Sequence, residues 1–297
     1  MAIQVFDNTT VKWMHDGKRH LVHIQQDASP ECPRDPVNDL LTVMACWHRR
    51  HNLGDDVVGK RNPDEFWQEL VRKNVPSGEV LKAVMSGNLT GIGVKKNADN
   101  QELLDIYETY SLDTVLGKSS PSTELVYEAV SAGVAEEYLL DDLTISHCQI
   151  LLRPYLEWLP LYLYDHSGIT MRTSSFNDRW DSGQVGFIYM LKDRLMQELD
   201  GISEENWREQ AIAFMQAEVG LYDQYLTGDV YGYTYYEEGD GGWKETDAVW
   251  GFFGCDILTN GMLDYIGSGL SEAIQSDSYE MGEASVRQVV TTVVDFD

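Results

Sequence analysis

The segment YDQYLTGDVYGYTYYEEGDGGW, from Tyr222 to Trp243, contains six tyrosines, five carboxylates and no basic residue. Tyr231, Tyr233 and Tyr235 recur with the two-residue period of a β-strand whose alternate side chains share one face. The glycine-rich EEGDGG that follows predicts a turn into a second strand around residues 246–254. This part of the chain is therefore expected to form an antiparallel hairpin.

A long amphipathic helix is predicted just before this hairpin, from Ser203 to about Leu226. Its apolar residues recur at intervals that place them on one side of a helix. They are Trp207, Ala211, Met215, Val219 and Tyr222. The acidic residues of its first turns, such as Glu204 and Glu209, fall on the other side, so we expect a negative exposed face.

The remaining chain mixes both patterns. Short alternating runs before residue 27 predict a small antiparallel sheet, and residues 184–191 predict a further strand. Helical spacing predicts helices over 36–54 and 123–143, and Asn62, Pro63 and Glu65 form the start signal of another helix. The run 147–168 contains two prolines and favours strands. We expect an α+β fold, in which amphipathic helices pack on antiparallel sheet elements.

The net charge of −27 is distributed unevenly along the 297 residues. Residues 1–100 contain 13 Lys and Arg against 13 Asp and Glu, whereas residues 101–297 contain 9 against 36. We therefore expect a charge-neutral N-terminal α+β region, 1–100, and a strongly acidic α+β region, 101–297. Charge that served only solubility would be expected over the whole surface, but that interpretation stays open.

Such a surface repels nucleic acid and anionic membranes and attracts a basic groove on a partner protein. We expect no direct nucleic-acid partner, no membrane partner and no cofactor. The four cysteines form no C-x-x-C pair, and no early apolar leader or long apolar run is present, which predicts a cytoplasmic protein with reduced thiols. Eight tryptophans and sixteen tyrosines favour homo-oligomers.

The tyrosine-rich hairpin has two interpretations. Its tyrosines can pack beneath the preceding helix, or they can supply rigid contact area for a partner beside carboxylates that resemble phosphates. The second interpretation predicts a partner-binding face. That face comprises Tyr225, Tyr231, Tyr233, Tyr235, Glu237, Glu238 and Asp240.

The enzymatic alternative is a metal-dependent hydrolase. The chain contains no nucleophile elbow and no complete phosphate-binding loop, and we predict no catalytic or metal-binding residue for the leading interpretation. The alternative would use acids and bases that lie near one another in sequence. They are His48, His51, His166, Asp178 and Asp181. A simpler reading of the 179–183 segment is a polar turn before a buried strand, in which Asp181 caps backbone N–H groups.

Several strings resemble a family of uncharacterised acidic proteins encoded by phages, prophages and mobile elements. They are CWHRRHNLGD (46–55), LYLYDHSGITM (161–171), WDSGQVGFIYM (180–190), YDQYLTGDVYGY (222–233) and WGFFG (250–254). The resemblance covers most of the chain from Asp27 to Gly261, apart from residues 76–140. It carries over no catalytic residues.

The resemblance implies a protein of the host cytoplasm that inhibits a host defence complex with a basic DNA-binding surface. Gabija-type nucleases and restriction enzymes are the candidate targets, and inhibition would block or mimic DNA. A virion component is a further alternative. No sequence motif supports the choice of target, which rests on the resemblance and on the charge.

Overall fold

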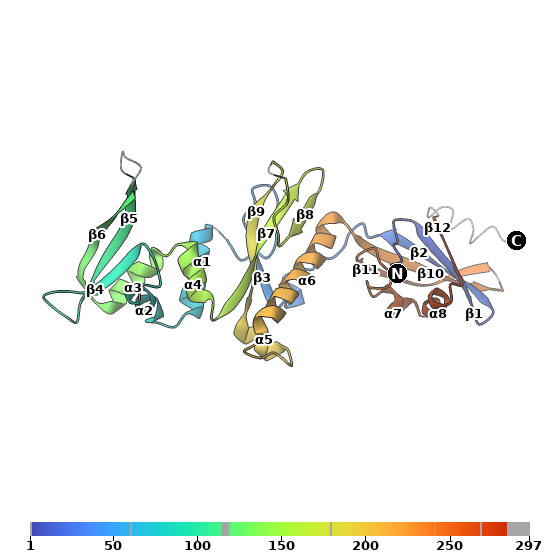
Figure 1. The fold of residues 1–297 in the computed structure, drawn as a ribbon. Helices are drawn as coiled ribbons and strands as arrows, with labels where there is room; N and C mark the ends of the chain where they lie inside the picture. Colours follow the sequence, from blue (N-terminus) through green and yellow to red (C-terminus); the bar gives the residue numbers. More distant parts are fainter. Residues whose placement is uncertain are drawn as a thin grey trace. The chain divides into compact units, whose positions relative to one another are not determined.

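The computed structural model confirms the α+β fold. It describes residues 2–59, 61–113, 119–178, 180–240, 242–267 and 269–283. Within these ranges the chain forms three antiparallel sheets and eight α-helices (Figure 1). Among the same residues, no helix is both long enough and apolar enough to cross a membrane.

The chain divides into two compact units that are each built from separate stretches of sequence. Unit 1 comprises Met1–Leu40, Pro160–Val185 and Phe214–Asp297, and unit 2 comprises Leu41–Leu159 and Gly186–Ala213. Residue 100, where the acidic sequence begins, lies inside unit 2. The change in charge along the chain therefore does not coincide with a boundary between units.

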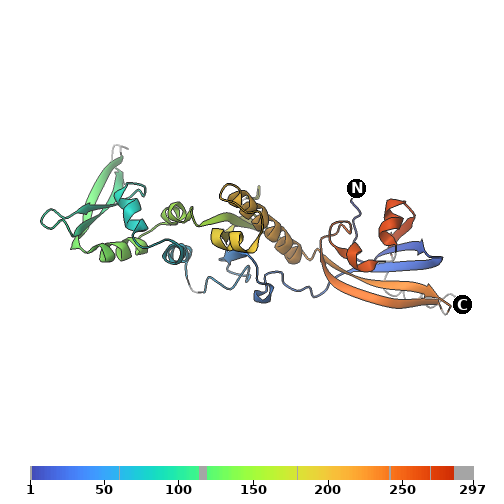
Figure 2. The ribbon, with the colours of Figure 1, turned by 90° about the horizontal axis from the view of Figure 1, so that it is seen from below.

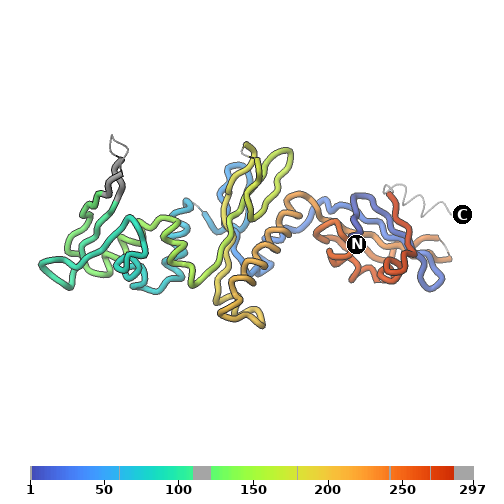
Figure 3. Tube along the Cα trace, in the orientation of Figure 1, coloured from blue at the N-terminus to red at the C-terminus, as the bar shows by residue number. Residues whose placement is uncertain are grey.

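Unit 1 contains a five-stranded sheet in the order β11-β10-β2-β1-β12. Its strands are β1 (Thr9–His15), β2 (Lys18–Gln26), β10 (Val230–Gly239), β11 (Gly242–Phe253) and β12 (Tyr279–Glu283). Asp16 and Gly17 both have positive φ, at 49° and 77°, so the β1–β2 turn has the two-residue form that fits strand twist. The antiparallel pairing expected before residue 27 and the hairpin expected after residue 228 are both confirmed, and Figure 3 traces the hairpin in orange.

One face of this sheet is covered by the short helices α7 (Met262–Ile266) and α8 (Leu270–Gln275), as Figures 1 and 2 show. Met262 and Leu270 of these helices join a buried cluster with Val22, Ile24 and Tyr233 of the sheet. The core of unit 1 therefore lies between the two helices and the sheet.

The predicted helix after residue 62 is confirmed as α1 (Pro63–Asn74). The Asn62 side chain accepts a hydrogen bond from the Glu65 N–H (2.9 Å), and Glu65 Oε2 accepts one from the Asn62 N–H (3.1 Å). These two bonds satisfy N–H groups that a helix start leaves without intrahelical partners. Trp67 of the helix is buried against Phe187, with ring centroids 4.5 Å apart.

The rest of unit 2 includes a three-stranded sheet in the order β4-β5-β6 and three further helices. They are α2 (Glu79–Met85), β4 (Ile92–Lys96), β5 (Leu104–Asp113), β6 (Ser119–Val130), α3 (Ala132–Asp141) and α4 (Ile145–Leu152). The helix predicted for 123–143 is wrong in its first part, where residues up to Val130 pair with β5. The strand expected at 147–152 is wrong too, because these residues belong to α4.

A four-stranded sheet has the order β3-β9-β7-β8. Its strands are β3 (Thr42–Cys46), β7 (Leu156–Asp165), β8 (Ile169–Arg172) and β9 (Ser182–Leu191). The helix predicted over 36–54 is wrong: only a 3-10 turn, η1 (Pro36–Asn38), precedes β3, which pairs with β9. Asp55 satisfies the outer backbone groups of Met44 at this sheet edge, because its carboxylate accepts from the Met44 N–H (2.8 Å) and its N–H donates to the Met44 carbonyl (2.8 Å).

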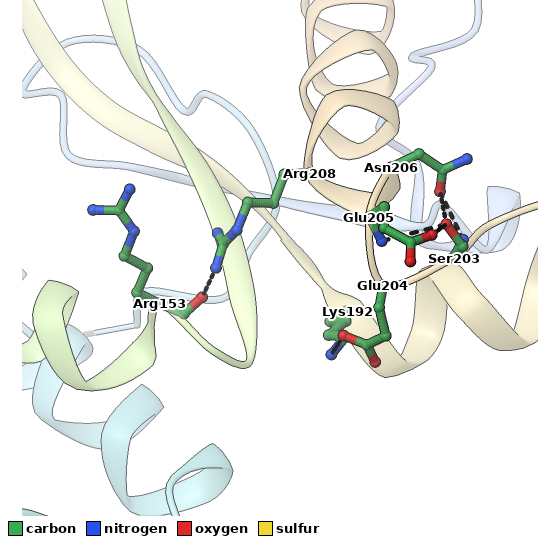
Figure 4. A network of polar contacts seen from close by, with 7 residues as sticks. All are labelled: Arg153, Lys192, Ser203, Glu204, Glu205, Asn206 and Arg208. Carbon is green, nitrogen blue, oxygen red and sulfur yellow. Dashed lines mark hydrogen bonds and ion pairs between the residues drawn. The ribbon is translucent and has the colours of Figure 1, made fainter.

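Two helices follow β9, namely α5 (Lys192–Glu198) and α6 (Trp207–Thr227). The predicted long helix is confirmed but begins at Trp207 rather than Ser203. The residues in between form a polar start (Figure 4), in which Asn206 Oδ1 accepts from the Ser203 N–H (2.6 Å). Lys192 pairs with Glu204 at 2.6 Å, and Arg208 donates to the Arg153 carbonyl. These contacts attach the start of α6 to α5 and to the segment before β7.

Candidate partner-binding surface

Three tyrosines of the predicted partner-binding face lie in the core of unit 1. The exposed fractions of Tyr231, Tyr233 and Tyr235 are 8%, 0% and 5%. They project from β10 into the cluster that α7 and α8 cover, opposite Ile24 and Val22 of β2. Their assignment to an exposed face is therefore wrong, and the packing interpretation describes them correctly, although α7 and α8 supply the cover.

The hydroxyl groups of these tyrosines bind neighbouring polar groups. Tyr233 donates to Asp247 Oδ2 (3.2 Å) and Tyr235 donates to Glu237 Oε1 (3.1 Å). His20 Nδ1 lies 2.6 Å from the Tyr235 hydroxyl oxygen. Burial, followed by the nearby Asp247 carboxylate, raises the pKa of Tyr233 well above its usual range. Tyr233 is therefore held in its protonated form, as a structural hydrogen-bond donor.

The other four residues of the predicted face are accessible to different degrees. Tyr225 is half-buried on α6 and stacks on Tyr222, with ring centroids 5.9 Å apart. Glu237 and Glu238 are half-buried at the end of β10, and Asp240 is exposed in the turn. Three carboxylates thus lie at this end of the hairpin.

One of these carboxylates is paired. Glu238 Oε2 accepts from Arg19 Nε at 2.8 Å, its other oxygen accepts from Arg19 Nη2, and the guanidinium lies 5.7 Å from the Trp243 ring centroid. This hydrogen-bonded pairing lowers the pKa of Glu238. Because Arg19 neutralises it locally, Glu238 contributes less to an external negative field than Glu237 or Asp240.

Strand β11 adds two exposed carboxylates that the sequence interpretation missed, Glu245 and Asp247. They lie opposite Tyr236 and Tyr235 of β10, across an irregularity in the pairing. Consecutive β10 residues point to opposite faces and cross-strand partners share a face, so the two carboxylates flank the strand on both sides. The predicted second strand, around residues 246–254, was the available signal, because its first residues are polar.

The residues of the hydrolase alternative form two pairs, His166 with Asp181 and His48 with His51, and Asp178 lies beside the first pair. In unit 1, His166 Nδ1 lies 3.0 Å from Asp181 Oδ2, with both side chains largely accessible. Asp178 accepts from the Trp180 and Asp181 N–H groups, both at 2.8 Å, which lowers its pKa. Asp178, rather than Asp181, is therefore the capping residue. The Ser182 hydroxyl donates this hydrogen bond to the Asp178 carbonyl and not to His166.

The second pair, His48 and His51, lies in the loop after β3 in unit 2. Their rings stack with centroids 5.1 Å apart, and the His51 N–H donates to His48 Nδ1 (3.2 Å). They do not share a helix face, since no helix forms there. Over the described ranges, no group of three or more His, Cys, Asp or Glu side chains is placed to hold a metal ion.

Comparisons of the chain with families of known proteins, with curated protein sequences and with solved structures find no match.

Proposed function

We propose that this protein is a phage or mobile-element counter-defence protein that binds a host DNA-handling defence complex and inhibits it. The observation that carries the proposal is the accessible acidic edge of unit 1, formed by the β10–β11 hairpin. Its carboxylates are Glu237, Glu238, Asp240, Glu245 and Asp247. Arg19 of β2 pairs with Glu238, and Lys244 lies opposite Glu237 on β11.

Such an edge favours a cationic partner. An exposed charge in water is screened over about 8 Å at physiological salt, so carboxylates a few residues apart act together on an approaching basic surface. The negative field of these carboxylates repels acidic partners, and it also accelerates the association of basic partners. A host nuclease or restriction complex with a positive DNA path has the required chemistry.

Charge density favours blocking over mimicry. The five hairpin carboxylates lie between the Tyr235–Asp247 pair and the turn at Asp240, a length of five residues that spans roughly 17 Å at about 3.3 Å per residue. That is about one charge per 3 Å, and Arg19 neutralises one of the five, whereas duplex DNA carries one charge per roughly 1.7 Å of its axis. An edge with about half of that density supports obstruction of a basic groove better than replacement of the phosphates.

The proposal is tested first by purifying the tagged protein from cells that express defence systems and identifying co-purified proteins by mass spectrometry. A DNA-handling complex, such as a Gabija-type nuclease or a restriction enzyme, is the expected partner. The recovered complex should lose nuclease activity when the protein is added. Recovery of no DNA-handling protein from such cells would count against the proposal.

A charge-matched pair of variants then locates the surface. The test variant combines Glu245→Gln with Asp247→Asn, which keeps an acceptor oxygen for the Tyr233 hydroxyl. The control combines Asp264→Asn with Glu272→Gln, two exposed positions on α7 and α8. Surface ion pairs contribute about 0.5 kcal/mol each, so the first variant should inhibit roughly fivefold more weakly. Equal weakening by both variants would show that net charge, rather than this edge, matters.

A further inference from the structure

Strand β11 is a long, largely exposed sheet edge, a property that among the described strands it shares with β6 of the three-stranded sheet. The edge of β3 is occupied by the Asp55 backbone and carboxylate, and the Met171 N–H of β8 donates to Asp223 (2.7 Å). Strand β12 has only five residues, whereas β11 has twelve. Most side chains of β11 are exposed. Within the part of the chain that the structure describes, β11 pairs with β10 alone. Its outer backbone groups are therefore available to an added strand.

The charges on β11 select between possible strands. A second copy of this chain would bring Glu245 and Asp247 against the same residues, and each chain has a net charge of −27. Like charges on paired strands destabilise the pairing, whereas opposite charges stabilise it. An added strand that carries arginine or lysine is therefore favoured over self-association along this edge.

A pocket at one end of β11 fits a cationic side chain. It has a volume of about 670 Å³. Its lining residues are Asp27, Ala28, Ser29, Glu31, Trp250, Gly251 and Phe253. Asp27 uses one carboxylate oxygen to accept from the Ser29 N–H (2.9 Å), and Glu31 makes no hydrogen bond or ion pair with the described residues. Two carboxylates thus stand beside an aromatic ring.

The indole of Trp250 is held in place by Gly232. A Cβ atom at Gly232 would lie 2.1 Å from the Trp250 ring, so only glycine lets the ring lie against the β10 backbone. Gly232 falls between Tyr231 and Tyr233, whose rings enter the core, which places Trp250 on the opposite face of the sheet. With 47% of its surface exposed, the indole offers its outer face to a cation, an arrangement that arginine favours.

We propose that β11 accepts an extended cationic segment of the partner as an additional strand, with one arginine or lysine side chain in the pocket beside Trp250. The inference rests on the proposed function for the identity of the partner. The backbone of β11 supplies hydrogen bonds, Glu245 and Asp247 supply charge complementarity, and the pocket fixes the register of the added strand.

The test uses a labelled peptide of ten residues in which arginine and threonine alternate, titrated with the full chain and followed by fluorescence anisotropy. Two further peptides carry N-methyl groups on all arginines or on all threonines. In an antiparallel addition, alternate N–H groups point to the neighbouring strand, so one methylated peptide should bind at least tenfold more weakly and the other nearly normally. Equal binding by both methylated peptides, or no binding by the parent peptide, would overturn strand addition.

The pocket is tested by Trp250→Ala, with Trp180→Ala as the matched control. Trp180 is 93% exposed in the loop before β9, so its removal takes away an indole without touching β11. Trp250→Ala should weaken peptide binding about fivefold and Trp180→Ala should leave it unchanged. If Trp250→Ala binds like the wild type, the side-chain pocket is wrong.

The two proposals fail separately. If a DNA-handling partner is recovered but the peptide does not bind, strand addition is wrong and the proposed function stands. If the peptide binds with the expected methylation pattern but no DNA-handling partner is found, the edge is a strand-binding site for a different cationic protein.

Discussion

Asp223 joins helix α6 to the short edge strand β8, and its removal should destabilise unit 1. One carboxylate oxygen accepts from the Thr170 hydroxyl (2.6 Å) and from the Met171 N–H (2.7 Å). Met171 is 1% exposed, so after Asp223→Ala its N–H has no ready access to water. A hydrogen bond to a charged group contributes about 1.5–3 kcal/mol. Since Asp223 is half-buried, we take the lower value twice and expect a loss of about 3 kcal/mol in unfolding free energy.

Two variants separate the contributions. Asp223→Asn keeps an acceptor oxygen without the charge and should cost about 1 kcal/mol, and Thr170→Val removes one of the two bonds and should cost about 1.5 kcal/mol. Because the two residues share a hydrogen bond, the double variant Asp223→Ala, Thr170→Val should show a coupling of about 1 kcal/mol. Urea unfolding followed by circular dichroism measures each value. A loss below about 0.5 kcal/mol for Asp223→Ala would refute the assignment, as that is within the range of neutral surface changes.

Two other changes have defined outcomes. Gly232→Ala should displace the Trp250 indole, since the new methyl group would lie 2.1 Å from the ring. The variant should therefore weaken binding of the arginine peptide as much as Trp250→Ala does. Unchanged binding would contradict the proposed contact between the peptide and the Trp250 indole. The pKa of Asp105 is lowered mainly by the Ala129 N–H (2.9 Å) and then by Asn97 Nδ2 (2.8 Å). The stability that this gives is present above the unfolded-state pKa, near 3.9, and is lost as the pH falls through the lower folded-state value. Wild type and Asp105→Asn should therefore differ in urea stability at pH 6 and converge towards pH 2, whereas a constant difference would show that the charge is not responsible.

The sequence predicted those elements whose signals are local. The capping box of Asn62 and Glu65 lies within four residues, so the start of α1 follows from the sequence alone. Strand β3 shows the opposite case, because its residues have helical spacing but bind β9 about 140 positions away. Its free edge is completed by Asp55, a contact that spacing does not reveal. Pairing between distant strands overrode the local pattern.

The sequence predicted the hairpin that carries the candidate surface, but it assigned buried tyrosines to the exposed face. The reason again lies in contacts between distant parts of the chain. A two-residue period states that Tyr231, Tyr233 and Tyr235 share a face, but it does not state which face is covered. The covering helices come from residues 262–275, and their sequence gave no indication that they would pack on this hairpin. The pairing of Glu238 with Arg19 joins positions 219 residues apart and was equally hidden. Accessible charge is thus a property of the assembled sheet.

A long open sheet edge exposes a protein to unwanted pairing, most of all with its own copies, which are present at the highest concentration. The exposed Glu245 and Asp247 oppose that pairing by repulsion, and the irregularities between β10 and β11 increase the local twist. Neither device hinders a cationic strand, for which the same carboxylates are attractive. The acidic composition therefore restricts the edge to positively charged partners, so the feature that keeps β11 from pairing with itself also defines what it binds.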